Sequence, residues 1–350
     1  MARVHIQGSG TIGAPLIHLF NRYSTELGFD EVTFTKNSPR VSDLPLVEKL
    51  QAAGGTFVVA KEKTQDFERE GFQVEGALQD AMEEATVIIE ATPSGIALGR
   101  QDEYAAMEGP KAFLAQGSEA GFGLPYAARV NDEELDALDD RFVHIVSCNT
   151  HNIAALIRSI ALSGDDAPGF GRGSVVCIRR GTDVGQAGKA PLAPQVSIHD
   201  EKEGTHHAHD VIELYKTKDI ELDLFSSAIK VPTTFMHTLW FQFELGRETN
   251  VDEVVERIAA DPLVALTDKE TSNMVFNVGR EFGPFGRIVN QGVVPEQTLH
   301  VDGNQVSGFC FTPQDGNALL SNIAASTRFA HPEDWQKRCD ALNELLWDRL

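Results

Sequence analysis

Blocks of apolar residues alternate with amphipathic stretches along the first 150 residues, and this pattern predicts strands separated by helices. The runs RVHIQ (3–7) and EVTFT (31–35) resemble strands, and the stretch between them has helical spacing. Further strands are predicted at TFVVA (56–60), ATVIIEATPSG (85–95), KAFLAQGSE (111–119) and RFVHIVSC (141–148). Strands that alternate with helices indicate a parallel sheet, whose ligands bind at the carboxyl ends of the strands.

The pattern changes after about residue 170. Longer apolar runs predict strands at GSVVCIRR (173–180), LDLFSSAIKVP (222–232), TLWFQFEL (238–245) and VSGFCFTP (306–313). One helix is predicted among them at VDEVVERIAA (251–260), and the tail of the chain has helical spacing. We therefore expect a second domain of the α+β class with a mainly antiparallel sheet.

Size and charge restrict the classes of function. The chain has 350 residues, enough for two domains, and no apolar run approaches the roughly 18 residues of a membrane span. The N-terminus enters a predicted strand without the apolar core of a signal peptide, so we expect a cytoplasmic protein and no membrane partner. The net charge of −22 argues against nucleic-acid binding, and an anionic substrate would need a local positive patch.

The cysteines and histidines do not predict a metal site. Four cysteines, at positions 148, 177, 310 and 339, are far apart, form no C-x-x-C pair and are expected to be reduced. The run THHAHD (205–210) contains three histidines, but no cysteine or carboxylate has the spacing of a further ligand. A polar loop at a substrate site is the preferred interpretation of this run.

A glycine motif follows the first predicted strand and opens the first predicted helix. The segment GSGTIG matches G-x-G-x-x-G, which in this context indicates a Rossmann dinucleotide-binding domain, although a structural turn is the alternative. The first glycine allows a tight turn, the second lets pyrophosphate approach the backbone, and the third lets helix and strand pack closely. The helix N-terminus favours the phosphate charge. The residues expected to hold the cofactor here are Gly8, Gly10, Thr11, Ile12 and Gly13.

The end of the second predicted strand bears on the choice between NAD and NADP. An acidic residue there would bind the ribose 2′-hydroxyl of NAD, but the chain has Lys36 and no carboxylate before Asp43. Lys36 is able to accept a 2′-phosphate, so NADP is permitted and NAD is not excluded. A solvated loop lysine is the alternative interpretation.

Cys148 stands where a predicted strand ends and a helix begins. A helix N-terminus lowers the pKa of a thiol and so increases the fraction of nucleophilic thiolate. Taken alone, Cys148 is more simply a buried structural cysteine. Two downstream features favour chemistry: Arg179 and Arg180 end a strand and suit phosphate binding, and His237 is a polar ring between apolar strand residues. A surface ion pair and a structural histidine are the respective alternatives.

These blocks occur together, in this order, in one known family. The chain resembles the archaeal-type (type II) phosphorylating glyceraldehyde-3-phosphate dehydrogenases over most of its length. The matching segments are GSGTIG (8–13), VIIEATPSGI (87–96), AQGSE (115–119), VSCNT (146–150), RRGTD (179–183), THHAHDV (205–211) and VPTTFMH (231–237). The resemblance implies a dinucleotide-binding domain of residues 1–148, completed by the C-terminal helix 313–350, and a catalytic domain of residues 149–312. It also suggests a homotetramer.

The resemblance implies a role for each candidate residue. The thiolate of Cys148 would attack the aldehyde of D-glyceraldehyde 3-phosphate, and His237 would take a proton while hydride leaves for NAD or NADP. Inorganic phosphate would then release the acyl phosphate. Residues expected near the substrate and phosphate sites are Asn149, Thr150, His151, Arg179, Arg180, His206 and His207. Further cofactor contacts are expected from Thr92, Pro93, Gln116, Gly117 and Asn322.

Departures from the family pattern leave other functions open. The family normally has S-C-N-T-T-G where this chain has His151 and Asn152 after Thr150, and the replaced threonine helps to bind phosphate there. The chain also lacks a basic residue that usually follows the glycine motif. One alternative is therefore a related dehydrogenase for a different phosphorylated or acidic aldehyde. Another is a non-catalytic nucleotide-binding relative.

Overall fold

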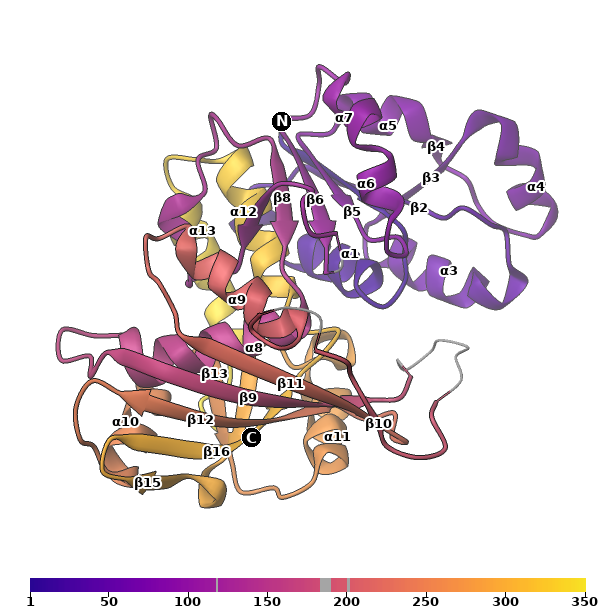
Figure 1. The fold of residues 1–350 in the computed structure, drawn as a ribbon. Coiled ribbons are helices and arrows are strands. Elements are labelled where there is room, and N and C mark those ends of the chain that lie inside the picture. Colours follow the sequence, from indigo (N-terminus) through magenta and orange to yellow (C-terminus); the bar gives the residue numbers. More distant parts are fainter. Residues whose placement is uncertain (118, 183–189, 200–201) are drawn as a thin grey trace. The chain divides into compact units, whose positions relative to one another are not determined.

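The computed structural model describes residues 1–117, 119–182, 190–199 and 202–350, and the chain divides into two compact units (Figure 1). The first unit comprises Met1–Ala128, Leu135–Val146 and Leu319–Leu342. The second unit comprises Arg129–Glu134, Ser147–Ala318 and Asn343–Leu350. Ser118, in the AQGSE block, and residue 183, which ends the RRGTD block, lie outside the described residues. The predicted domain boundaries stay a prediction, because contacts within one chain do not show which pieces fold alone.

The sheet of the first unit is entirely parallel in its described pairings, and its central strands are buried on both faces. The chain runs outward from β1 to β4 on one side and then crosses to β5 and β6 on the other side of β1. This reversal creates a switch point beside β1. The strands, in spatial order, are β4 (Gly76–Ala77), β3 (Thr56–Val59), β2 (Glu31–Thr35), β1 (Arg3–Gln7), β5 (Val87–Glu90), β6 (Ala112–Gln116), β8 (Phe142–Ile145) and β7 (Leu124–Tyr126).

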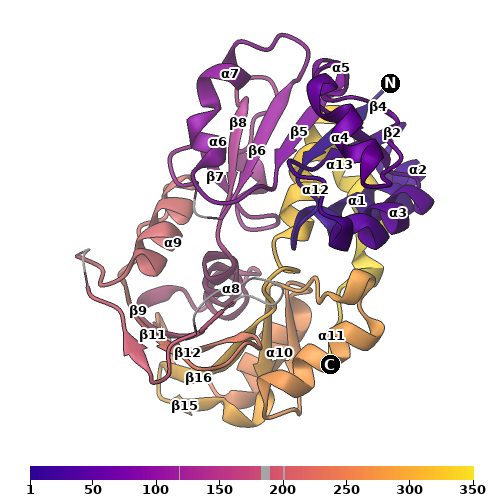
Figure 2. The same ribbon diagram turned by 90° about the vertical axis from the view of Figure 1, so that its right-hand side faces the viewer.

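Helices lie on both faces of this sheet (Figure 2), which confirms the predicted Rossmann-type domain. They are α1 (Gly13–Arg22), α2 (Ser24–Leu27), α3 (Leu44–Ala52), α4 (Thr64–Arg69), α5 (Leu78–Glu84), α6 (Ile96–Gly99), α7 (Gln101–Ala105), α12 (Leu319–Ala330) and α13 (Trp335–Cys339). The last two come from the end of the chain, and α12 packs on α1 and on strands β5 and β6.

The second unit is built on a mixed sheet whose described pairings are mainly antiparallel, as predicted. The parallel exceptions are β9 with β11 and β13 with β14. The strands, in spatial order, are β10 (Gln195–Val196), β11 (Leu224–Val231), β9 (Phe170–Arg180), β12 (His237–Leu245), β16 (Gln305–Thr312), β14 (Gly292–Pro295) and β13 (Val264–Thr267), with β15 (His300–Asp302) on β16. Buried and partly buried residues alternate along β12, so one face packs on the core.

Four helices accompany this sheet among the described residues. They are α8 (Cys148–Ile157), α9 (His206–Lys216), α10 (Val251–Ala260) and α11 (Ser272–Phe282). Helix α8 contacts α9, β14 and β16, and every residue from Asn149 to Ile157 is buried. A π-helical turn, Arg158–Leu162, continues α8. The helix that begins the catalytic segment is therefore a core element, and its first residue is its most accessible position.

The predicted helical tail is only partly correct. Helix α12 ends before Pro332, which lacks the N–H that a continuing helix requires, and α13 stops at Cys339. A 3-10 helix, Asp340–Leu345, follows α13, and residues 346–350 are not helical. The N–H of Leu266 donates to the carbonyl of Asp348 at 3.0 Å, and the N–H of Leu350 donates to that of Leu266 at 2.9 Å. The chain thus ends alongside β13, within the second unit.

Candidate functional site

The glycine loop of the first unit has the shape that a dinucleotide pyrophosphate needs. Gly8 has a φ of 98°, and a side chain at Gly13 would place its Cβ 1.9 Å from the carbonyl oxygen of Gly8. A side chain at Gly10 would meet no atom within 4 Å, so this position faces open space. Helix α1 begins here without a side-chain N-cap, and the buried Oγ of Ser9 has no partner among the described residues. The loop therefore fits a phosphate at a helix N-terminus.

The ammonium groups of Lys36 and Lys63 both contact the segment that follows β2. Lys36 follows this strand, and its Nζ lies 3.0 Å from a carboxylate oxygen of Asp43. The Nζ of Lys63 donates to the carbonyl of Asn37 at 3.1 Å. Lys63 was missed from the sequence because it comes from the segment after β3. The pairing with Asp43 also means that a 2′-phosphate would compete with a carboxylate for Lys36.

Thr92 and Pro93 lie in the turn that follows β5, and Glu90 ends that strand. The hydroxyl of Thr92 donates to the Glu90 carboxylate at 2.5 Å, and the carbonyl of Pro93 accepts from the N–H of Ile96 at 3.4 Å. Glu90 is buried and is also bound by the guanidinium of Arg100 at 3.2 Å. The turn is thus fixed to the carboxyl end of the central sheet.

A buried carboxylate from the AQGSE block holds the same turn from its other side. Glu119 is 3% exposed, and its carboxylate accepts from the main-chain N–H groups of Gly95 and Leu98, the latter at 3.0 Å. Gly117, two residues earlier, has a φ of 61°. The sequence signal for Glu119 was only its place in a block shared with the family. Its geometry makes it the link between the loops after β5 and β6.

Cys148 is the first residue of α8, as the sequence predicted. Ser147 caps the helix, and its Oγ accepts from the N–H of Thr150 at 3.3 Å. Cys148 is partly exposed, whereas Cys177 and Cys310 are fully buried. Burial raises the pKa of both of these other thiols to about 12. Cys148 is therefore the accessible thiol of the second unit, at the positive end of a helix dipole.

The residues after Cys148 are buried in the second unit. Asn149 is 5% exposed, and Thr150, His151 and Asn152 are fully buried. The Nδ1 of His151 lies 3.0 Å from the carbonyl of Ser147, one turn earlier. This ring thus folds back on its own helix.

The side chain of Asn152 is fully buried and hydrogen-bonded within the second unit. Its amide donates to the Oγ1 of Thr312 at 2.7 Å and accepts from the thiol of Cys310 at 3.1 Å. A Cβ at Gly292 would lie 2.6 Å from its side-chain oxygen, so a larger residue there would force Asn152 to shift. Asn152 joins α8 to β16, and packing explains this departure from the family pattern.

The arginine pair at the end of β9 splits into two environments. Arg180 is 3% exposed at its side chain, and its guanidinium reaches both carboxylate oxygens of Asp315 at 3.2 and 3.4 Å. Arg179 has a buried Nε without a partner among the described residues. Arg287 lies near Arg180 and Asp315, and burial lowers its pKa. Arg180 and Arg287 thus both lie near the carboxylate of Asp315, and these arginines make the local charge of the described residues more positive than that of the chain as a whole.

His237 begins β12 and is bound on both ring nitrogens. Its Nδ1 accepts from the N–H of Arg180 at 2.9 Å, and its Nε2 lies 2.8 Å from the side-chain amide of Gln314. The oxygen of the same amide accepts from the main-chain N–H of His237 at 2.7 Å. Burial, followed by the charges of Arg180 and Arg179, holds the pKa of His237 well below its ordinary value.

His206 and His207 begin α9, and their rings stack with centroids 4.1 Å apart. His206 is exposed, whereas His207 is buried, with Nδ1 3.0 Å from the Oγ1 of Thr205 and Nε2 without a described partner. Burial lowers the pKa of His207 to about 3, with smaller contributions from His206 and Arg179. His207 therefore lies near Arg179, and His206 stacks on the ring of His207.

The turn of residues 313–317 supplies polar groups that the sequence analysis did not single out. Gln314 binds His237, Asp315 binds Arg180, and the amide of Asn317 donates to the carbonyl of Cys148 at 2.8 Å. Three residues of one turn thus contact the three predicted site segments of the second unit. The only sequence signal was the polar P-Q-D-G-N run at the end of a predicted strand.

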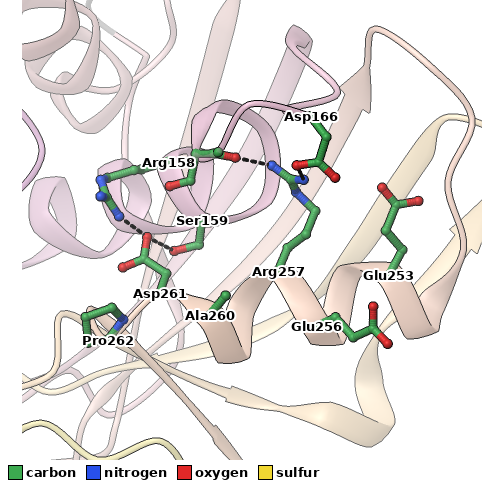
Figure 3. Close-up of a pocket in the computed structure, with 11 residues that line it drawn as sticks. Arg158, Ser159, Asp166, Glu253, Glu256, Arg257, Ala260, Asp261 and Pro262 are labelled. Carbon is green, nitrogen blue, oxygen red and sulfur yellow. Dashed lines mark hydrogen bonds and ion pairs between the residues drawn. The ribbon is translucent and has the colours of Figure 1, made fainter.

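A cavity of about 440 Å³ lies elsewhere in the second unit (Figure 3). It is found at the end of α8 opposite Cys148, and Arg158, Arg257 and Asp261 line it. None of the predicted site residues contributes to its lining. Within the described ranges, no three His, Cys, Asp or Glu side chains are grouped so that they would hold a metal ion. None of the described helices is long and apolar enough to cross a membrane.

Comparison with known proteins gives full-length relatives but no matching family model. A protein from Metallosphaera sedula named glyceraldehyde-3-phosphate dehydrogenase is 27% identical over 349 residues, which cover 98% of this chain and 97% of the relative. A protein of the same name from Sulfolobus acidocaldarius is 25% identical over 92% of this chain and 90% of its own length. One from Pyrococcus furiosus is 25% identical over 95% of both chains.

Proposed function

We propose that this chain, a divergent member of the archaeal-type glyceraldehyde-3-phosphate dehydrogenase family, oxidises D-glyceraldehyde 3-phosphate to an acyl phosphate, with NAD or NADP accepting hydride. The observation that carries the proposal is the accessible thiol of Cys148 at a helix N-terminus, in the same unit as the arginine pair and the buried His237. We further propose a soluble, cytoplasmic homotetramer.

The chemistry starts at Cys148, because its thiolate is the nucleophile that the helix N-terminus favours. Addition to the aldehyde carbon gives a hemithioacetal, and loss of hydride from this carbon gives a thioester. Main-chain N–H groups at the start of α8 stabilise charge on the oxygen, and His237 is the base that takes the hydroxyl proton as hydride leaves. Inorganic phosphate then attacks the thioester, and the Cys148 thiolate leaves.

The phosphate groups of the substrates would bind in the second unit, where basic side chains offset the net charge of −22. Arg179 and Arg180 supply forked donors, and Arg180 forms an ion pair with Asp315. In the first unit, the glycine loop holds the pyrophosphate of the cofactor, and Lys36 and Lys63 favour a 2′-phosphate. These features favour NADP as the better of the two cofactors.

A different phosphorylated or acidic aldehyde is the second candidate substrate, since His151 replaces a threonine that binds phosphate in the family. The test is a reduction assay with NAD⁺ and NADP⁺ over a panel of aldehydes, with and without inorganic phosphate. The main proposal expects the fastest phosphate-dependent reduction with D-glyceraldehyde 3-phosphate. A faster reaction with another aldehyde would select the second candidate. Cofactor binding without turnover, together with an unreactive Cys148 thiol, would indicate a non-catalytic relative.

A further inference from the structure

We propose that Asn317 is a positioning residue for the reaction at Cys148: its buried amide holds the peptide group between Cys148 and Asn149, so that the N–H of Asn149 donates to the oxygen of the bound substrate. The inference rests on the proposed function, because that oxygen gains negative charge when the Cys148 thiolate adds to an aldehyde. Asn317 lies in the turn after β16, 169 positions from Cys148 in the chain.

The side chain of Asn317 is fully buried and contacts two main-chain carbonyl groups. Its Nδ2 donates to the carbonyl of Cys148 at 2.8 Å and to that of Gln291 at 3.2 Å. A carbonyl oxygen only accepts, so the NH₂ group must face both of them. The Oδ1 of Asn317 has no partner within the described part of the chain. A buried oxygen without a partner lowers stability, so an amide is a poor choice here for packing alone.

The turn that carries Asn317 is held against the rest of the second unit. The main-chain N–H of Asn317 donates to the carbonyl of Pro313 at 2.9 Å, and Asp315 has a φ of 65°. A Cβ at Gly316 would lie 2.0 Å from the carbonyl oxygen of Ile288, so the two backbones touch without room for a side chain. The amide of Asn317 therefore reaches α8 from a defined position.

The carbonyl of Cys148 and the N–H of Asn149 belong to one peptide group. A trans peptide group is planar, and its C=O and N–H point in opposite directions, so a bond that fixes the carbonyl also directs the N–H. Peptide groups in the middle of a helix are held through both their C=O and their N–H, but the first N–H groups of a helix have no acceptor within it. The bond from Asn317 thus strengthens the one side by which this peptide group is held.

The N–H of Asn149 is available to a substrate. Ser147 uses the next two donors of α8, because its Oγ accepts from the N–H of Thr150 at 3.3 Å and its carbonyl accepts from that of His151 at 2.9 Å. Among the hydrogen bonds of the described residues, none uses the main-chain N–H of Asn149. Side chains of a helix tilt towards its N-terminus, so the thiol of Cys148 and this N–H leave the helix at the same end.

The chemistry uses this donor without transferring its proton. The thiolate of Cys148 forms a C–S bond to the aldehyde carbon, and the π electrons of the carbonyl move to the oxygen. The N–H of Asn149 donates a hydrogen bond to this oxygen and keeps its proton. Negative charge returns to the same oxygen when phosphate attacks the thioester, before the C–S bond breaks. Both the formation and the release of the acyl group should therefore depend on Asn317.

Asn290 is the matched control for Asn317. It is also fully buried in the second unit, and its Nδ2 also donates to two main-chain carbonyls, those of Pro262 and Trp347, each at 3.0 Å. Its Oδ1 accepts from the N–H of Trp347 at 3.1 Å. These bonds hold the end of the chain and not α8. Asn290→Ala and Asn317→Ala thus remove the same chemical group and differ in the peptide that they release.

The first test uses no substrate, so it is independent of the proposed function. Cys148 and Asn149 form the only cysteine–asparagine pair in the sequence. Protein labelled with ¹³C′-cysteine and ¹⁵N-asparagine therefore gives one HNCO cross-peak, from this peptide group. Asn317→Ala should shift the carbonyl signal upfield, because the carbonyl loses a hydrogen bond, and Asn290→Ala should leave it in place. An unshifted signal in Asn317→Ala would overturn the proposal.

The second test separates the reaction at the substrate oxygen from the reactivity of the thiol. The burst of NAD(P)H before phosphate is added reports the formation of the thioester. Asn317→Ala should lower its rate constant by roughly ten- to a hundredfold, with little change in the aldehyde concentration at half-saturation. Alkylation by iodoacetamide places charge on the leaving iodide and not on a carbonyl oxygen, so its rate at Cys148 should stay near that of the wild type. Asn290→Ala should keep both rates.

Three outcomes contradict the proposal. A wild-type burst in folded Asn317→Ala would show that the peptide needs no such support. Equal falls in burst and alkylation would mean that Asn317 acts on the thiol, and equal burst losses in Asn290→Ala and Asn317→Ala would reduce its role to stability. If Asn317→Ala does not fold, Asn317→Ser retains one donor and should show smaller changes of the same sign. A wild-type protein inactive towards every aldehyde would refute the proposed function, whereas the cross-peak would still report whether Asn317 holds this peptide.

Discussion

The side-chain amides of Gln116 and Asn322 bind each other reciprocally, although 206 positions separate them in the chain. The amide of Gln116 donates to the oxygen of Asn322 at 2.5 Å, and that of Asn322 donates back at 2.9 Å. Gln116 ends β6, and Asn322 is fully buried in α12. The pair thus fixes the C-terminal helix to the carboxyl edge of the first sheet, where the cofactor is expected to bind.

Gln116→Ala and Asn322→Ala should each lower the free energy of unfolding by about 1–3 kcal/mol, because each removes one side of an amide pair whose Asn322 member is fully buried. The double variant should lose less than the sum, since the second change removes a group whose partner is already gone. Urea titrations of the three variants measure this coupling. Strictly additive losses would show that the two amides act independently. Cofactor affinity should fall in parallel with the loosening of α12.

The elements found correctly from the sequence are those whose pattern is local. Strands at residues 3–7 and 31–35 have the predicted bounds, since a buried parallel strand needs only a short apolar run between polar turns. The strands β13 and β14 and the helix α11 were missed, because runs such as VALT are too short to distinguish from a buried helix or loop. Tertiary pairing, which no local pattern encodes, decides those cases.

In the candidate site, too, residues with a local sequence pattern were found, and residues that act through distant contacts were missed. Cys148 was recognisable from its position between a strand and a helix, and the structure places it there. Glu119, Gln314 and Asn317 were missed because each acts through main-chain groups far away in the sequence. Such contacts depend on how distant turns meet. A polar residue that binds a backbone carbonyl or N–H has the same local sequence as one that faces water.

Alkylation of the native protein should modify a single thiol. Cys148 is partly exposed, whereas Cys177, Cys310 and Cys339 are buried, and burial raises the pKa of Cys177 and Cys310 to about 12. At pH 8 a thiol with that pKa has only about 10⁻⁴ of its population as thiolate. Mass spectrometry after brief iodoacetamide treatment should find one adduct per chain, on Cys148. The adduct should disappear in Cys148→Ala and persist in Cys339→Ala.

The same variants test the role of this thiol in turnover. Cys148→Ala should abolish NAD(P)H formation and leave cofactor binding almost unchanged, because the glycine loop belongs to the first unit. Cys339→Ala should retain activity. Turnover by Cys148→Ala at the wild-type rate would contradict the proposed chemistry.

The Lys36–Asp43 ion pair should control the preference between the two cofactors. Asp43→Asn removes the carboxylate 3.0 Å from the Lys36 ammonium, so a 2′-phosphate no longer competes with it. We expect the Kd for NADPH to fall by roughly three- to tenfold, with a smaller change for NADH. Lys36→Gln should have the opposite effect. Equilibrium binding at low and moderate salt measures both, because a phosphate contact weakens as salt rises.

Lys337→Gln is the matched control for these lysine variants, since Lys337 lies on α13 of the same unit and is exposed. It should leave both Kd values unchanged. Equal changes for NADH and NADPH in Lys36→Gln would mean that Lys36 does not contact the 2′ position.

Buried histidines should make the protein sensitive to acid. Burial lowers the pKa of His5 and of His207 to about 3, whereas in the unfolded chain both return to about 6.5. Between these values the unfolded state binds more protons, so the free energy of unfolding rises with pH. This contribution is fully present above about pH 6.5 and is lost as the pH falls towards 3. Urea titrations from pH 7 to 4 should therefore show a steadily falling midpoint.

His5→Asn tests this explanation in the first unit, because His5 binds only the Oγ1 of Thr33, at 2.7 Å, among its described hydrogen bonds. The variant lacks the group that must be charged at low pH. Its stability relative to wild type should therefore improve as the pH falls from 7 to 4. A difference that stays constant with pH would show that another group causes the acid sensitivity.

The ion pair of Arg158 and Asp261, in the cavity at the far end of α8, should matter for stability and not for the chemistry (Figure 3). The Asp261 side chain is 2% exposed, and it also accepts from the Oγ of Ser159 at 2.9 Å. Arg158→Met leaves this carboxylate buried without its cation, which should cost about 3 kcal/mol. Arg158→Met combined with Asp261→Leu should cost less than Arg158→Met alone, since no uncompensated charge remains.

Arg69→Met is the control for this pair, because Arg69 and Asp66 form an exposed ion pair at 3.2 Å and should contribute under about 1 kcal/mol. Chemical unfolding gives all four free energies. The folded variants should keep wild-type kcat and KM, since Cys148 begins α8 and Arg158 directly follows the last residue of that helix. A loss for Arg158→Met as small as that for Arg69→Met would show that water screens the cavity. A fall in kcat at unchanged stability would instead mean that the far end of α8 is coupled to the thiol.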